Sequence, residues 1–215
     1  MSTPDCCMAP MAGHSWLGAA ASFVGMWVLM MVPMMLPSLI PMLARYRQVL
    51  GRTSGASLLI ATAGIGYFFV WTVAGILLYP LGAVLAALEA REPAVAGAVP
   101  IAAGLVVLIA GFVQISAWKA QGVACCREVP APGRTGTGGA WRHGVRLGLH
   151  CARCCGNLMA ILIAVGMMDL RWMAVVTAAI TVERVAPSGE RLARAIGAAV
   201  IVGGVVLIAR AAGLG

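Results

Sequence analysis

The sequence predicts an all-α fold: a polytopic integral membrane helix bundle of about six transmembrane helices, with no soluble domain. Of its 215 residues, 61% are hydrophobic and only 10% are charged, and the mean hydropathy is +0.96. A soluble domain is about half apolar and about a quarter charged, so this chain cannot cover a water-facing surface. The composition therefore excludes a soluble enzyme, a disordered chain and a nucleic-acid-binding module.

Six apolar stretches have the length of membrane spans, because a helix needs about 20 apolar residues to cross about 30 Å of hydrocarbon. In chain order the predicted spans are 16–43, 57–79, 95–117, 146–168, 170–186 and 192–212. Together they form a transmembrane domain over 16–212, preceded by a tail over 1–15. Only a short polar break separates the fourth span from the fifth, which is short, so five spans are the alternative.

The basic residues predict how the chain is oriented. Most of the Lys and Arg residues outside the spans follow the first, third and fifth spans, which places them on one side of the membrane. The opposite side holds only Arg91, Arg171 and Arg210. Since Lys and Arg gather in cytoplasmic loops, we expect both termini to be extracytoplasmic, in a bacterial cytoplasmic (inner) membrane. The long loop over 118–145 is then cytoplasmic, and its Pro- and Gly-rich part is typical of a linker.

The first span is rich in methionine and proline. The methionines form two stripes at intervals of four residues, one of Met26, Met30 and Met34 and the other of Met31 and Met35. Such intervals place side chains on one helix face, and thioethers are soft ligands that suit Cu(I). Prolines repeat the same interval and each frees a backbone carbonyl. The alternative is that the methionines pack a core and the prolines are tolerated kinks.

The fourth span opens with a cysteine cluster. Cys151, Cys155 and Met159 align at intervals of four residues, and Cys154 lies beside them. Thiolates bind Cu(I) and Zn(II), and a neighbouring positive charge favours the thiolate. His150 and Arg153 are the candidates for that charge. The alternative is that these are small buried residues of an apolar helix.

Two further cysteine groups lie outside the spans. Cys125 and Cys126 stand in the long loop on the same predicted side as the cluster, as a second ligand segment would. The tail from Cys6 to His14 offers more soft ligands on the opposite, extracytoplasmic side. The alternative is that the tail is a frayed terminus. Soft sites on both faces, with a methionine stripe between them, would suit transfer across the bilayer.

Charged residues at span ends are expected to be interfacial rather than functional, although an ionisable residue inside a membrane is a functional suspect. Asp169 is predicted to cap a turn, and Glu183 to pair with Arg184 or with another span's end. His143 is predicted to be a loop histidine. No hydrolase, phosphate-binding or dinucleotide motif is present in the sequence, so we do not expect an enzyme.

Several motifs together carry a family resemblance. They are the Met-rich first span with Trp27 and its prolines; Gly66-Tyr67 with Trp71; Ala110-Gly111 with Gln114 and Lys119, leading to Cys126-Arg127; and Gly148-Leu149-x-Cys151-x-x-Cys154-Cys155 with Leu158-Met159, Trp172-Met173 and Glu183. With them the chain resembles the predicted metal-binding integral membrane protein family, catalogued as domain of unknown function 2182. The resemblance implies metal binding, with copper as the soft-ligand choice and zinc less favoured.

These features lead to three functional hypotheses. The first is a membrane protein that binds Cu(I) and delivers it to a copper-dependent membrane enzyme, with the lipid bilayer as its other partner. The second is a non-catalytic accessory subunit that packs against a larger membrane complex. The third is a thiol redox membrane protein that uses the cluster cysteines with the 125–126 pair. We favour the first.

Overall fold

The computed structural model describes residues 15–51, 54–117, 119, 136–166, 169–186 and 189–213. These residues include six helices and no strand, so the predicted all-α fold is confirmed. The helices are α1 (Trp16–Leu50), α2 (Ala56–Arg91), α3 (Pro93–Ile115), α5 (Thr137–Val165), α6 (Leu170–Val185) and α7 (Gly189–Ala211).

Five of the described helices are long and apolar enough to cross a membrane: α1, α2, α3, α5 and α7. The predicted fifth span corresponds to α6, which has 16 residues. At about 1.5 Å per residue it is about 24 Å long, shorter than the hydrocarbon layer. It begins at the predicted cap, where the Asp169 carboxylate accepts a hydrogen bond from the Arg171 amide at 2.8 Å.

Several helices extend well beyond the predicted spans. α1 continues to Leu50, α2 to Arg91, and α5 begins at Thr137, so residues 137–145 of the predicted loop are helical. Hydropathy marks where a helix is apolar, whereas backbone hydrogen bonding continues into polar turns. The prediction of a loop histidine at His143 was therefore wrong. It lies buried in α5, its ring stacked on that of Tyr46 at 4.5 Å between centroids.

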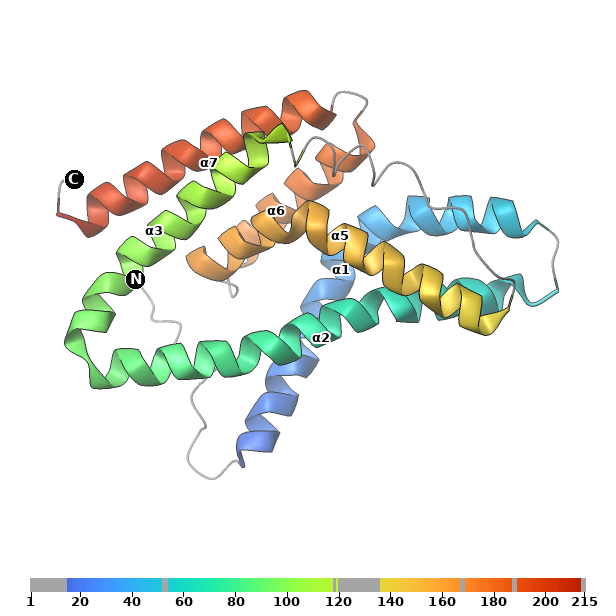
Figure 1. Ribbon diagram of the computed structural model, residues 1–215, viewed down its shortest axis with the longest axis horizontal. Coiled ribbons are helices and arrows are strands. Elements are labelled where there is room, and N and C mark those ends of the chain that lie inside the picture. The colour runs from blue at the N-terminus through green and yellow to red at the C-terminus, as the bar shows by residue number, and fades with distance from the viewer. Residues whose placement is uncertain are drawn as a thin grey trace.

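The helices are arranged as two close pairs around α1 and α6 (Figure 1). α3 lies beside α7 and α2 beside α5, while α1 crosses α2, and α6 contacts α1, α5 and α7. Glycine allows the backbones of each pair to approach closely, as is common between membrane helices. A Cβ atom at Gly66 of α2 would lie 2.7 Å from the Trp141 carbonyl oxygen of α5, and one at Gly204 of α7 would lie 2.9 Å from the Leu108 amide nitrogen of α3.

α1 changes direction along its length, between its dark-blue and light-blue parts in Figure 1. Pro33, Pro37 and Pro41 lie inside the helix, and a proline removes one backbone hydrogen bond and kinks the helix. The indole nitrogen of Trp27 anchors the first part of α1 to α2 by donating a hydrogen bond to the Trp71 carbonyl oxygen at 2.8 Å.

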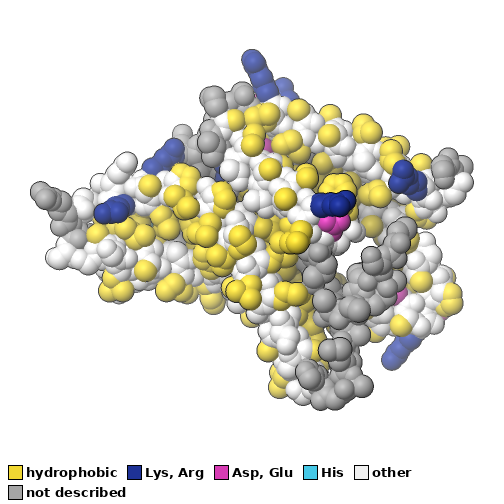
Figure 2. All heavy atoms as spheres, turned by 180° about the vertical axis from the view of Figure 1, so that it is seen from behind, with side chains coloured by type: hydrophobic (Ala, Val, Ile, Leu, Met, Phe, Trp, Pro, Cys, Tyr) yellow, Lys and Arg dark blue, Asp and Glu magenta, His cyan; other side chains and the backbone are white. Residues whose placement is uncertain are grey.

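The outer surface is largely apolar. Figure 2 shows hydrophobic side chains over much of one face, with Lys and Arg in a few separated places. Large residues such as Leu29, Leu77 and Ile109 are more than half exposed. An apolar surface of this extent is stable in lipid but not in water, which is consistent with an integral membrane protein.

Candidate metal centre

Three sulfur atoms from two helices meet in the main core. Cys151 and Cys155 stand one turn apart on α5, and both are free thiols with their side chains buried. The Cys151 Sγ atom lies 3.9 Å from the Cys155 Sγ atom and 3.8 Å from the Met35 Sδ atom of α1. We call Cys151, Cys155 and Met35 the sulfur trio.

The local sequence explains why these helices meet here. On α5 the buried positions Gly148, Cys151 and Cys155 form one stripe, and on α1 Met35 continues the stripe that begins at Trp27. Gly148 lets α2 come close, since a Cβ atom there would lie 2.9 Å from the Tyr67 carbonyl oxygen. Tyr67 is thereby placed against the trio.

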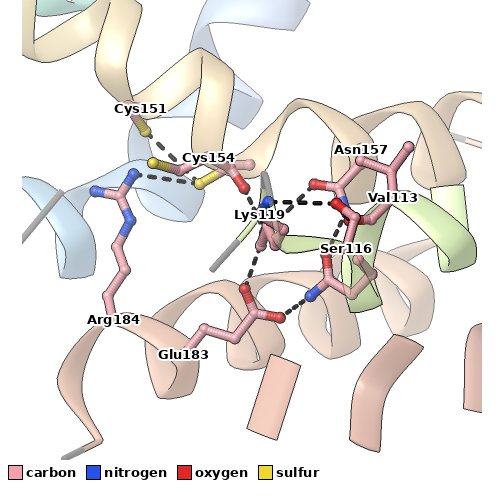
Figure 3. A network of polar contacts seen from close by, with 10 residues as sticks. Val113, Ser116, Lys119, Cys151, Cys154, Asn157, Glu183 and Arg184 are labelled. Atoms are coloured by element: carbon pink, nitrogen blue, oxygen red, sulfur yellow. Dashed lines mark hydrogen bonds and ion pairs between the residues drawn. The ribbon is translucent and has the colours of Figure 1, made fainter. Parts of the chain in front are cut away.

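Two side chains from other helices contact the trio. The Tyr67 hydroxyl of α2 donates a hydrogen bond to the Cys151 Sγ atom at 2.9 Å. Arg184 of α6 donates through Nη2 to the Cys155 Sγ atom at 3.3 Å and reaches the Met42 Sδ atom through Nη1 at 4.0 Å. Figure 3 shows the Arg184 guanidinium pointing from α6 towards the cysteines.

The positive charge beside the thiols therefore comes from α6, and not from the residues that the sequence suggested. Arg153 is exposed, because two residues after Cys151 the helix has turned about 200° away from the buried face. His150 lies one position before Cys151 and is only half-buried. Spacing along α5 alone could not identify Arg184, which is 29 residues from Cys155.

A buried polar network lies next to the trio (Figure 3). The Lys119 Nζ atom, just beyond α3, lies 3.1 Å from the Glu183 Oε2 atom of α6, with only 1% and 4% of these side chains exposed. Lys119 also donates a hydrogen bond to the Cys154 carbonyl oxygen of α5. The Gln114 amide nitrogen donates to Glu183, and the Asn157 amide nitrogen donates to Gln114.

This network changes what was expected of Glu183. Pairing with the end of another span is confirmed, because Lys119 follows α3, whereas Arg184 faces the sulfur atoms. Glu183 is 3% exposed and each of its carboxylate oxygens has a partner inside the protein, so the expectation of an interfacial residue was wrong. A charge in such surroundings requires a partner. The network therefore fixes the end of α6, and with it Arg184, against α5.

The remaining predicted ligands fall into four groups. Met31, Met34 and Met159 are buried in the same core as the trio. Met26 and Met30 are half-buried at its edge, so the buried face of α1 takes members from both predicted stripes. Cys154 is disulfide-bonded. Cys125, Cys126 and the tail from Cys6 to His14 lie outside the described residues.

Comparison with known proteins identifies the family. Residues 24–207 match the family model PpoB2, described as a copper chaperone. The chain belongs to the PpoB2 copper chaperone family. No curated protein and no solved structure matches it. Together with the apolar helices, membership of this family makes the protein a copper-handling membrane protein, and the metal-handling character implied by the sequence resemblance is confirmed.

The geometry of the sulfur trio suits the cargo of a copper chaperone. Three sulfur atoms, each about 2.3 Å from one metal ion, stand about 3.8 to 4.0 Å apart in tetrahedral or trigonal arrangements. The separations from the Cys151 Sγ atom to the other two sulfur atoms, 3.8 and 3.9 Å, lie in this range. Thiolate and thioether sulfurs are the soft ligands that select Cu(I). In the part of the chain that the structure describes, no three His, Cys, Asp or Glu side chains converge, so a three-ligand site here would need a methionine sulfur.

Proposed function

We propose that this PpoB2-family chaperone carries one Cu(I) ion on Cys151, Cys155 and Met35 and delivers it to a copper-dependent membrane enzyme. The observation that carries the proposal is the buried sulfur trio, with sulfur–sulfur distances of 3.8 and 3.9 Å. A carrier needs no acid–base or nucleophilic machinery, in line with a non-catalytic role. It needs soft ligands that are shielded from water and oxygen, and all three trio side chains are buried.

The charges around the trio support a monovalent cargo. Cysteine ligands bind as thiolates, so Cu(I) with Cys151 and Cys155 has a net charge of about −1. The Arg184 guanidinium, 3.3 Å from the Cys155 Sγ atom, offsets this charge. Lys119 and Glu183 cancel one another. The loaded centre is then close to neutral, which a low-dielectric interior favours.

We further propose that copper moves along α1. Met31 lies one turn before Met35 and is completely buried, with Met34 beside it. These thioethers offer weaker soft ligands between the trio and the N-terminal end of α1. With both termini extracytoplasmic, the tail from Cys6 to His14 would be the donor or acceptor at that face, and Cys125 and Cys126 at the cytoplasmic face.

Copper content of the anaerobically purified protein tests the proposal. Wild-type protein loaded with Cu(I) and challenged with a chelator should retain about one copper per chain. Cys151→Ser/Cys155→Ser should lose it, and Met35→Leu should weaken retention on the order of tenfold or more, since a ligand is lost outright. Met26→Leu is the matched control, because it removes a half-buried methionine of the same helix. Equal copper in wild type and the double variant would overturn the assignment and favour an accessory role.

A further inference from the structure

Arg184 is half-buried and is placed unusually for an arginine in a membrane protein. The carboxylate of its neighbour Glu183 pairs with Lys119 and accepts a hydrogen bond from Gln114. The Arg184 guanidinium instead faces two sulfur atoms, those of Cys155 and Met42, at 3.3 and 4.0 Å. Its buried Nε atom has no hydrogen-bond partner among the described residues. The charge of Arg184 is thus directed at the metal centre and not at a carboxylate.

The permanent charge of Arg184 changes which metal ions the trio can hold. Two thiolates and one guanidinium sum to −1, so a monovalent ion brings the centre to zero and a divalent ion brings it to +1. An uncompensated charge in a low-dielectric interior is unfavourable. Arginine keeps its proton under all ordinary conditions, so the centre cannot adjust by deprotonating this group.

The number of available ligands also disfavours Zn(II). Zn(II) sites in proteins are almost always four-coordinate, while the trio supplies three sulfur atoms. The guanidinium next to Cys155 has five donors and no acceptor, so it cannot be the fourth ligand. It also fills the approach beside the Cys155 Sγ atom from the α6 side.

We infer that Arg184 is the residue that restricts the trio to monovalent soft cations and excludes soft divalent ones. This inference rests on the proposed copper site and adds its selectivity. The Lys119–Glu183 pair contributes by position, because it holds the end of α6 on which Arg184 stands. The relevant property is charge, so Ag(I) should bind and Cd(II), which is also a soft, thiophilic ion, should not.

Metal competition on the full-length protein in detergent tests this inference. Each protein receives equimolar Cu(I), Ag(I), Zn(II) and Cd(II) anaerobically, is washed with chelator, and is measured by mass spectrometry for each metal. Wild type should retain Cu(I) or Ag(I) and exclude both divalent ions. Arg184→Gln should raise the ratio of divalent to monovalent metal at least about tenfold, because one charge a few ångströms away at an effective dielectric constant of about 20 corresponds to a factor of about a hundred to a thousand before the protein relaxes. Arg184→Lys should keep the wild-type ratio.

Arg194→Gln is the matched control, since Arg194 is an exposed arginine of α7 that pairs with Glu190. An unchanged ratio in Arg184→Gln that still holds Cu(I) would overturn the inference and leave the copper site intact. Wild-type protein that retains Cd(II) as well as Ag(I) would also overturn it, and this arm needs no variant to fold. Wild-type protein that holds no monovalent metal would refute the proposed copper site itself.

Discussion

Breaking the buried Lys119–Glu183 ion pair should destabilise the protein far more than breaking an exposed ion pair. Glu183→Gln keeps the shape of the side chain and its contact with Gln114, but leaves the Lys119 ammonium buried with only neutral partners. The pair is 3.1 Å apart and its side chains are 1% and 4% exposed. Removing one partner of such a pair costs about 3 to 5 kcal/mol.

This free energy can be converted into a melting temperature. For a chain of this size, 1 kcal/mol corresponds to about 2 to 4 °C, so Glu183→Gln should lower the Tm by about 6 to 20 °C. Lys119→Met/Glu183→Gln removes both charges and should regain at least about half of the loss, because charges in one pair are coupled. Tryptophan fluorescence during heating in detergent gives the Tm of the wild type, the single variant and the double variant.

Glu190→Gln is the control for this series. It breaks the Glu190–Arg194 pair of α7, whose side chains are 57% and 65% exposed. An exposed pair of this spacing contributes about 0.3 to 0.5 kcal/mol, so the Tm should change by less than about 2 °C. If Glu183→Gln shifted the Tm no more than Glu190→Gln, or if the double variant were no more stable than the single one, our description of the network would be wrong.

Two further predictions concern packing and the surroundings of the trio. Gly144→Ala should lower the Tm by several degrees, because a Cβ atom there would overlap the Ala63 carbonyl oxygen of α2. Gly156→Ala on the same helix meets open space and should leave the Tm unchanged or raised. Equal shifts in the two variants would refute the close α2–α5 contact. Tyr67→Phe keeps the buried ring but removes the hydrogen bond to the Cys151 Sγ atom, so Cu(I) retention against a chelator should weaken on the order of tenfold; unchanged retention would show that this bond does not support the centre.

The helices could be predicted from the sequence because apolar length is a local property. The apolar core of each described helix falls within or overlaps a predicted span, from Trp16 in α1 to Ala211 in α7. The helix ends were predicted less well, since α5 begins nine residues before its apolar part. The buried stripe of α5 extends back to Ala140 and His143, a periodic signal that the hydropathy of the span does not record.

The site could be predicted only in part, because sequence spacing is local and the site is built from helices that are far apart in the sequence. Intervals of four residues identified Cys151, Cys155 and Met35, because side chains so spaced share one helix face. Which faces meet depends on contacts between helices far apart in sequence. Tyr67 is 84 residues from Cys151, and Arg184 comes from a short helix in which no cysteine pattern marks it. Two signals were available: Glu183 and Arg184 are adjacent charges in an otherwise apolar stretch, and the motifs of the family resemblance include Tyr67 and Glu183.

X-ray absorption at the copper edge tests the central claim most directly, since it reads the atoms that surround the bound ion. The protein is loaded anaerobically with one equivalent of Cu(I) and compared with Cys151→Ser/Cys155→Ser and Met35→Leu. We predict a Cu(I) centre with sulfur neighbours only, about three of them at about 2.3 Å, one fewer in Met35→Leu, and no ordered copper in the double variant. A wild-type spectrum dominated by nitrogen or oxygen neighbours, or one that is identical in the double variant, would contradict the assignment of the trio.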